Sequence, residues 1–303
     1  MLVGLTASGK SALALATAER WPDVEIVSMD SMQVYRGMDI GTAKASVAER
    51  ARTPHHMVDV ADPCEDYSVA RFQRDARTSI RAIEARGHRA LLVGGTGLYV
   101  HAVIDDFQFP GEDLTVRARI DAQYGGDDGV AEAYEVLQRT DPVAAARMEP
   151  NNRRRIVRAL EVFEITGRPF SSFGPGIGAS HPPVFEVRMA GLTLDAAALA
   201  SRTEQRLTDM IDAGLVEEVH GLLGRAAGWS RTARQAIGYK EFVDYLEGRV
   251  ASVEAATAQV AVRTRQFGRR QRAWFRREDR ITWFDAALKS ETVADDVMAW
   301  WSS

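Results

Sequence analysis

The chain has 303 residues, of which 46% are hydrophobic and 26% charged, and its formal net charge is −4 at pH 7. These are ordinary values for a soluble globular protein, and the length allows one large domain or two moderate ones. The single cysteine, Cys64, excludes an internal disulfide and a zinc site with several cysteine ligands. Apolar runs stay well short of the roughly 18–20 residues of a membrane span, so we expect a cytoplasmic protein without a membrane partner.

The chain opens on GLTASGKS, residues 4–11, which fits the pattern G-x-x-x-x-G-K-[ST] of a phosphate-binding loop. In such a loop, backbone N–H groups cradle phosphate oxygens, Lys10 supplies a positive charge and the Ser11 hydroxyl can bind Mg²⁺. The alternative is an ordinary Gly/Ser turn before a helix. The positions expected to bind phosphate are Gly4, Leu5, Thr6, Ala7, Ser8, Gly9, Lys10 and Ser11.

Only three residues precede this loop, whereas a buried strand usually has about 5–6. We expect that the natural strand begins upstream of Met1, because of a truncation or a misassigned start codon.

The segments after the loop alternate between helix and strand. We expect a helix over 11–20, a strand over 24–30 that ends at Asp30, a helix over 69–87 closed by Gly87, and a strand over 89–95 followed by a helix. This alternation predicts an α/β fold: a P-loop NTPase-like core with a parallel sheet flanked by helices.

The pattern changes near residue 106. From there to about 168 the chain predicts only helices, and a Pro/Gly/Ser-rich connector over 167–183 leads back to a strand-like run. The remainder is predicted to be mostly helical. We therefore expect an inserted all-helical subdomain at 108–180, within a core formed by 1–107 and 181–303.

Two polar positions follow the predicted strands of the core. P-loop NTPases commonly hold a metal with an Asp at the end of a neighbouring strand. Here one strand ends at Asp30, which is a candidate general base, helix N-cap or magnesium ligand. The other is followed by Thr96, between two glycines. Thr96 is a candidate functional residue, and the alternative is that it only forms a turn. His55 and His56 would point to opposite sides of a strand and are predicted to be structural.

Two arginine clusters contrast with the net acidic charge. Residues 263–277 contain seven arginines and no acid. On a helix four of them share one face, while Phe267 and Trp274 are expected to pack against the core; the four are Arg265, Arg269, Arg272 and Arg276. A second cluster at 153–158 lies in the predicted insertion. The repulsion within such clusters favours a polyanionic partner, and we expect RNA held between core and insertion.

Seven blocks occur in an order that resembles one family. They are GLTASGKS, DSMQVYRGMDIGTAKA (30–45), PHHMVDV (54–60), GGTGLYVHAV (94–103), NRRRIVRALEV (152–162), QAIGYKE (235–241) and TRQFGRRQRAWFR (264–276). Together they resemble the bacterial tRNA dimethylallyltransferases from residue 4 to about 283. The chain departs from that family at Leu5, where proline is usual, and it lacks the C-terminal zinc finger of eukaryotic members.

The resemblance implies transfer of a dimethylallyl group from its diphosphate to N6 of adenosine 37 of tRNA, with Mg²⁺ as cofactor and a monomeric enzyme. It implies that Asp30 is the general base, that Thr96 lines the reaction channel and that Arg202 binds the diphosphate together with the loop. The positions that match stretches touching tRNA are Asp30, Ser31, Met32, Gln33, Arg153, Arg154, Arg155, Ile156, Val157, Gln235, Gly238, Tyr239 and Lys240.

Three other functions use some of these features. A small-molecule kinase would use the loop for ATP but leaves both arginine clusters without a role. A prenyltransferase could act on free adenine nucleotides. A non-catalytic RNA-binding protein could retain the loop as a relic, although intact Lys10, Ser11 and Asp30 argue against that.

Overall fold

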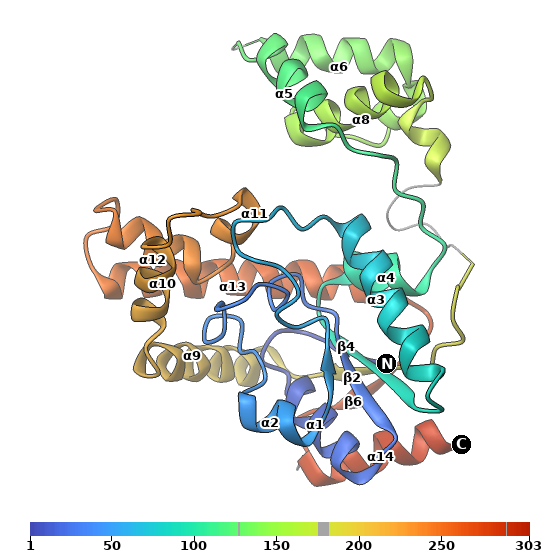
Figure 1. The fold of residues 1–303 in the computed structure, drawn as a ribbon, viewed down its shortest axis with the longest axis vertical. Helices are drawn as coiled ribbons and strands as arrows, with labels where there is room; N and C mark the ends of the chain where they lie inside the picture. The colour runs from blue at the N-terminus through green and yellow to red at the C-terminus, as the bar shows by residue number, and fades with distance from the viewer. Residues whose placement is uncertain (127, 175–181, 289) are drawn as a thin grey trace. The chain divides into compact units, whose positions relative to one another are not determined.

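A computed structural model describes residues 1–126, 128–174, 182–288 and 290–303 (Figure 1). The chain divides into two compact units, one of Met1–Asp105 with Pro183–Ser303 and one of Asp106–Pro182. The second unit begins close to the expected position 108. The expected boundary at 180 lies outside the described residues.

The first unit is built on a six-stranded sheet with the order β3-β2-β4-β1-β5-β6. All neighbouring strands are parallel, so their carboxyl ends lie at one edge of the sheet, where α/β proteins bind ligands. The strands are β1 (Leu2–Gly4), β2 (Val24–Ser28), β3 (His55–His56), β4 (Arg89–Gly94), β5 (Met189–Thr193) and β6 (Ile281–Asp285). β6 lies where we expected mainly helix.

Helices cover both faces of this sheet, because successive strand residues point to opposite sides. Leu2 packs with α1 (Lys10–Arg20) and α14 (Ser290–Ser302) on one face. Val3 belongs to the hydrophobic cluster on the other face, to which the remaining large helices of this unit contribute residues (Figure 1). They are α3 (Val69–Glu84), α4 (Gly97–Ile104), α9 (Ala196–Asp212), α10 (Leu215–Leu223), α12 (Tyr239–Leu246) and α13 (Val253–Phe275). Short helices α2 (Val47–Arg52) and α11 (Arg231–Arg234) complete the unit.

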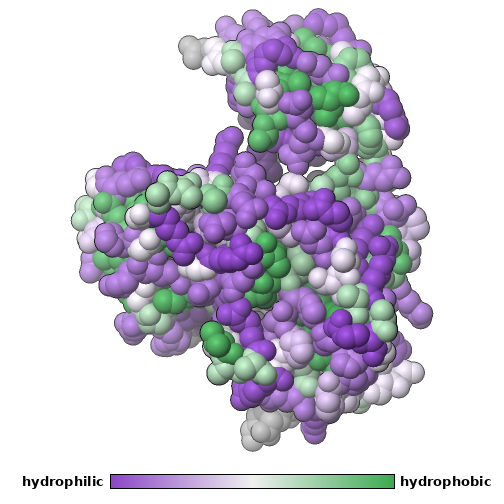
Figure 2. Space-filling model, in the orientation of Figure 1, coloured by the Kyte–Doolittle hydropathy of each residue, from purple (hydrophilic) through white to green (hydrophobic). Residues whose placement is uncertain are grey.

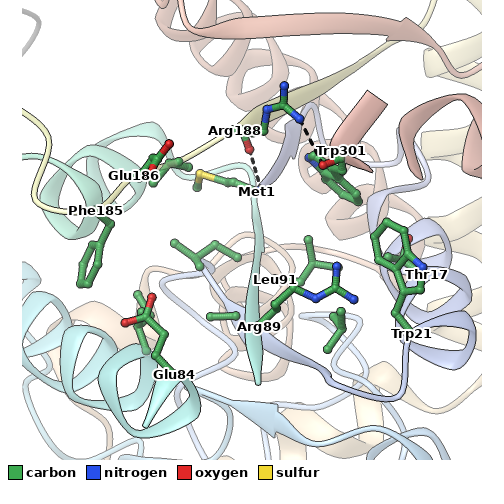
Figure 3. Close-up of a pocket in the computed structure, with 15 residues that line it drawn as sticks. Met1, Thr17, Trp21, Glu84, Arg89, Leu91, Phe185, Glu186, Arg188 and Trp301 are labelled. Atoms are coloured by element: carbon green, nitrogen blue, oxygen red, sulfur yellow. Dashed lines mark hydrogen bonds between the residues drawn. The ribbon is translucent and has the colours of Figure 1, made fainter. Parts of the chain in front are cut away.

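The three-residue strand β1 is fully buried and lies inside the sheet. It pairs with β4 on one side and β5 on the other, through Leu2 with Val93 and Ala190 among others. The Met1 amino group donates to the carbonyl oxygen of Arg188 at 2.8 Å beside a cavity of about 220 Å³ (Figure 3). Burial lowers the pKa of this amino group to about 5. β1 therefore has hydrogen-bonded backbone on both sides despite its length.

The second unit contains helices and no strand among its described residues. Its helices are α5 (Leu114–Gln123), α6 (Gly129–Thr140), α7 (Pro142–Ala145), α8 (Arg153–Thr166) and the 3₁₀ segment η1 (Phe170–Phe173). Ile120, Leu137 and Ile156 form its buried centre, which is a hydrophobic core of its own. In the described part of both units, every helix is too short or too polar to cross a membrane.

A buried carboxylate ties β2 to its neighbours on the sheet. Glu25 is 4% exposed and accepts hydrogen bonds from Arg86, His88 and His56, at 2.7, 2.8 and 2.6 Å. Burial alone would raise the pKa of Glu25, but these hydrogen bonds outweigh it and lower the pKa to about 2. His55 instead bonds the carbonyl oxygen of Thr53. Both histidines therefore hold structural contacts, as the sequence predicted.

We expect Glu25→Gln to lower the free energy of unfolding by about 2 kcal/mol at pH 7. The folded-state pKa lies below the usual 4.5, so the stabilisation is complete above pH 4.5 and is lost as the pH falls toward 2. Urea unfolding of both proteins at pH 7, 5 and 3 measures the gap. A gap that is the same at pH 7 and pH 3 would contradict this account.

Candidate active site

The loop after β1 has the geometry of a phosphate-binding loop. Gly4 has φ +149°, and a Cβ there would lie 2.9 Å from the carbonyl oxygen of Leu192, so β5 leaves no room for a side chain. Gly9 has φ +97° and is the N-cap of α1. The first N–H groups of a helix have no partner within the helix, so this end of α1 offers donors for an anion. The prediction of a loop followed by a helix is confirmed.

A cavity of about 660 Å³ opens at this loop. Its walls are the loop itself, the segment 39–46 and side chains of α9, including Arg202 and Arg206. The Arg202 guanidinium lies 3.9 Å from the Cβ position at Gly9 and donates to the carbonyl oxygen of Ala286 at 3.1 Å. The structure thus brings Arg202 to the loop, 191 residues away in sequence (202 − 11). The order of the strands explains this, because α9 follows β5, the neighbour of β1.

Positive charge is concentrated in this cavity. Lys10 donates to the carbonyl oxygen of Leu5 at 2.6 Å. Burial and, to a smaller extent, the charge of Arg206 lower the pKa of Lys10 to about 7, against the opposing effect of Asp30. Burial also lowers the pKa of Arg206. Sequence reasoning missed Arg206; its position four residues after Arg202 on one helix face was the signal that could have found it.

Asp30 lies just beyond the carboxyl end of β2. Its Oδ1 accepts from the N–H groups of Met32 at 2.8 Å and Gln33 at 3.4 Å, so it caps the turn that follows. Oδ2 has no hydrogen bond among the described residues. Asp30 therefore makes a capping contact through one oxygen, while the other is without a hydrogen bond in the described part of the chain.

Thr96 lies at the carboxyl end of β4 and is the N-cap residue of α4, yet its side chain makes no capping hydrogen bond. The glycines around it permit close approaches. A Cβ at Gly94 would lie 2.6 Å from the Met29 backbone oxygen, and one at Gly97 would lie 2.3 Å from the Trp274 ring. Among residues 94–97, Thr96 alone has a side chain, and it lies at the same sheet edge as the phosphate loop.

The predicted tRNA contacts of the first unit differ in accessibility. Ser31 and Met32 are half-buried and Gln235 is exposed. Gln33 uses its side chain inside the protein, accepting from Ser28 at 2.8 Å and donating to the carbonyl oxygen of Thr42 at 3.1 Å.

Tyr239 was expected among the tRNA contacts, but it is fully buried and donates to Glu218 at 2.6 Å. Gly238 is buried as well, and Lys240 pairs with Asp244. Side-chain contact of Tyr239 with RNA is excluded in this arrangement, because its ring fills the core.

Within the second unit, the cluster on α8 is divided in the same way. Arg154 and Arg155 are exposed, whereas Ile156 and Val157 are buried in the core of the unit. The side chains of Ile156 and Val157 therefore cannot make the tRNA contacts that we expected of them. Arg153 binds Asp121 and neighbouring carbonyl oxygens. Arg154 and Arg155 remain the candidates for an outside partner.

The arginine run of the first unit forms the last half of α13. Arg265 and Arg269 are exposed, as is Arg276 at the end of the helix. Trp274 packs against the core as predicted. Phe267 instead lies half-buried beneath the guanidinium of Arg270, 5.7 Å from the ring centre.

Comparison with known proteins decides the family. A model described as IPP transferase matches residues 33–278. This chain belongs to the IPP transferase family. Curated tRNA dimethylallyltransferases of Nocardia farcinica and Mycolicibacterium paratuberculosis are 46% and 44% identical to it, over 94% and 99% of the chain and 90% and 96% of their own lengths.

Solved structures of the family share the fold. The tRNA isopentenylpyrophosphate transferase of Bacillus halodurans superimposes with a TM-score of 0.71 at 37% identity, covering 99% of this chain and 94% of its own. A eukaryotic dimethylallyltransferase described as acting on tRNA reaches 0.80 at 28% identity, covering 94% and 73%. The prediction of an α/β core with a parallel sheet flanked by helices, drawn from the resemblance and from strand–helix alternation, is confirmed.

We expect the affinity for inorganic diphosphate to fall as the pH rises above 7. Lys10 has a pKa of about 7 in the free protein, and a bound anion would raise it, so binding takes up a proton above pH 7. The affinity then falls by up to about tenfold per pH unit. Lys10→Arg is the matched control, because arginine stays charged over this range. Calorimetric titrations from pH 6.5 to 9 that give equal slopes for both proteins would contradict the assignment.

Proposed function

We propose that this chain transfers a dimethylallyl group from dimethylallyl diphosphate to N6 of adenosine 37 in tRNA. The observation that carries the proposal is that the cavity at the loop and the Asp30 carboxylate lie at one sheet edge, near enough for the charge of Asp30 to act on Lys10. Family membership and relatives named tRNA dimethylallyltransferase support the choice of reaction.

The leaving group would occupy the cavity at the phosphate loop. The bond between the allylic carbon and the diphosphate oxygen breaks, and its electron pair leaves with the diphosphate. The N–H groups at the start of α1, Lys10, Arg202 and Arg206 supply positive charge to that product. The phosphate loop then binds the diphosphate leaving group of a prenyl donor, and ATP takes no part.

The acceptor side requires a base. The N6 lone pair is delocalised into the adenine ring, so the amine gives up its proton as the C–N bond forms. Asp30 Oδ2 would take this proton while Oδ1 keeps its contacts with Met32 and Gln33, so the turn stays fixed during the reaction. Thr96 would line the path between donor and acceptor.

Mg²⁺ would be bound mainly by the phosphate oxygens of the donor. The exposed Ser11 hydroxyl, at the mouth of the cavity, suits it as the protein ligand. Among the described residues no group of three His, Cys, Asp or Glu side chains is suited to hold a metal. When bound, the ion would supply further positive charge to the diphosphate.

One assay tests the reaction class. Labelled dimethylallyl diphosphate with Mg²⁺ is offered unmodified tRNA, AMP, or tRNA lacking adenosine at position 37. Label on the first RNA alone supports the proposal. Label on AMP would identify a prenyltransferase of free nucleotides. Phosphoryl transfer from ATP without prenyl transfer would identify a kinase, and RNA binding without either reaction would leave an RNA-binding protein.

Asp30→Asn tests the base. Asparagine keeps an oxygen for the N–H groups of Met32 and Gln33 but cannot accept the proton, so we expect turnover to fall by roughly 10²–10⁴. The dissociation constant for unmodified tRNA should change less than about twofold. Single-turnover kinetics and filter binding measure the two quantities. Turnover close to that of the unaltered enzyme would remove Asp30 from the mechanism.

The exposed arginines of α13 would bind RNA phosphates. If Arg265 and Arg269 each neutralise one phosphate of a single-stranded loop, their joint replacement by alanine lowers the log–log salt slope of tRNA affinity by about 1.4. Arg20→Ala is the control, because this exposed arginine lies at the far end of α1 from the phosphate loop. A slope that changes equally in both variants would show that α13 does not contact the RNA.

A further inference from the structure

Gln271 is the buried polar residue within the arginine run of α13. It is only 4% exposed, between Arg270 and Arg272. Its Oε1 accepts from the backbone N–H of Thr6, and its Nε2 donates to the backbone carbonyl oxygen of Gly95, each at 2.9 Å. One side chain therefore joins the phosphate loop, the segment after β4 and α13.

Both contacts are made to backbone groups, which fixes the orientation of the amide. An N–H requires an acceptor and a carbonyl requires a donor, so the oxygen of Gln271 must face Thr6 and the nitrogen must face Gly95. Glutamate could accept from Thr6 but, when ionised, could not donate to Gly95. Methionine has a similar length and flexibility but offers neither group. The site thus requires an amide of this length.

The surrounding backbone is shaped to admit this side chain. A Cβ at Gly95 would lie 2.3 Å from Nε2 of Gln271 and 2.8 Å from the carbonyl oxygen of Gly4. The β4 end therefore approaches both the phosphate loop and α13 so closely that no side chain fits between them. The next residue, Thr96, carries the side chain at this strand end. Its backbone nitrogen belongs to the same peptide group as the Gly95 carbonyl that accepts from Gln271.

The contact with Thr6 also bears on the phosphate loop. Because the Thr6 N–H is occupied by Gln271 and the Ser8 N–H by the carbonyl oxygen of Leu5 at 3.2 Å, these two donors are turned into the protein. The N–H groups left for an anion are that of Ala7 and those from Gly9 to the start of α1. Gln271 thereby helps to set which donors of the loop face the cavity.

We propose that Gln271 is a positioning residue for the transfer reaction. It holds the phosphate loop and the Thr96 segment at a fixed separation, so that the bound diphosphate and the reaction path stay aligned. It acts through Thr6 and Gly95 and touches no reacting atom. The kinetic consequence of this role rests on the proposed function. The hydrogen bonds of Gln271 do not depend on that function.

Three variants separate positioning from general stabilisation. Gln271→Met removes both hydrogen bonds at similar volume, and Gln271→Glu keeps only the acceptor. Gln259→Met is the matched control, because Gln259 is exposed on the same helix. For each protein we would measure amide hydrogen exchange, the dissociation constants for inorganic diphosphate and for unmodified tRNA, and kcat and KM for dimethylallyl diphosphate.

In Gln271→Met we expect faster exchange at the Thr6 amide, roughly tenfold weaker diphosphate binding and a lower kcat. Binding of tRNA should stay within about twofold, since the exposed arginines are unchanged. Gln271→Glu should keep part of the Thr6 protection but bind diphosphate no better than the methionine variant, because its negative charge lies beside the loop. Gln259→Met should match the unaltered protein.

Unchanged diphosphate binding and kcat in a folded Gln271→Met protein would overturn the proposal. An equal loss of diphosphate and tRNA affinity would also overturn it, because that is the result of a general loss of structure. If the unaltered protein transfers no prenyl group, the proposed function fails. Amide exchange and diphosphate binding then still test the positioning of the loop.

Discussion

Backbone pairing of β1 with β4 and β5 is the interaction on which the site depends. This strand has three residues, and parallel neighbours on both sides hold it in the middle of the sheet. Its carboxyl end therefore lies between the ends of β4 and β5, which lead to Thr96 and to the helix that carries Arg202. Strand order brings the loop and Arg202 together and places Thr96 at the same sheet edge, although the three are far apart in sequence.

The same cavity concentrates positive charge at an energetic cost. Lys10 and Arg206 both have lowered pKa values because burial removes water from them. The positive charge of Arg206 also lowers the pKa of Lys10. Asp30 offsets part of this cost. A bound anion would offset more of it, so that this cost would favour the binding of a diphosphate. Anion binding and the protonation of Lys10 are therefore linked.

Local patterns made much of the fold predictable, and long-range packing made the rest unpredictable. Local sequence patterns identify the phosphate loop, the strands that lead to Asp30 and Thr96, and the helix of arginines. Each of these patterns spans no more than some 20 residues. β6 was missed because three of its residues, including Trp283, are exposed, which weakens the apolar run that identifies a buried strand. Gln271 makes its contacts only with distant partners, Thr6 and Gly95, and no local pattern states where those partners lie.

Packing accounts for Tyr239 in the block 235–241, one of the seven that resemble the family. Glu218 accepts from the N–H groups of Asp39, Ile40 and Gly41 at 3.0, 2.8 and 3.3 Å, and the Tyr239 hydroxyl donates to the same carboxylate. A Cβ at Gly41 would lie 2.5 Å from the Tyr239 ring, so glycine is required there.

The segment shaped in this way lines the cavity at the phosphate loop. Burial and Glu218 together raise the pKa of Tyr239 far above its usual range, so its hydroxyl remains a donor at any physiological pH. Tyr239 thus contributes to the site by fixing a cavity wall from within the core. Exposed neighbours such as Gln235 are left as the candidates for contact with RNA from this block.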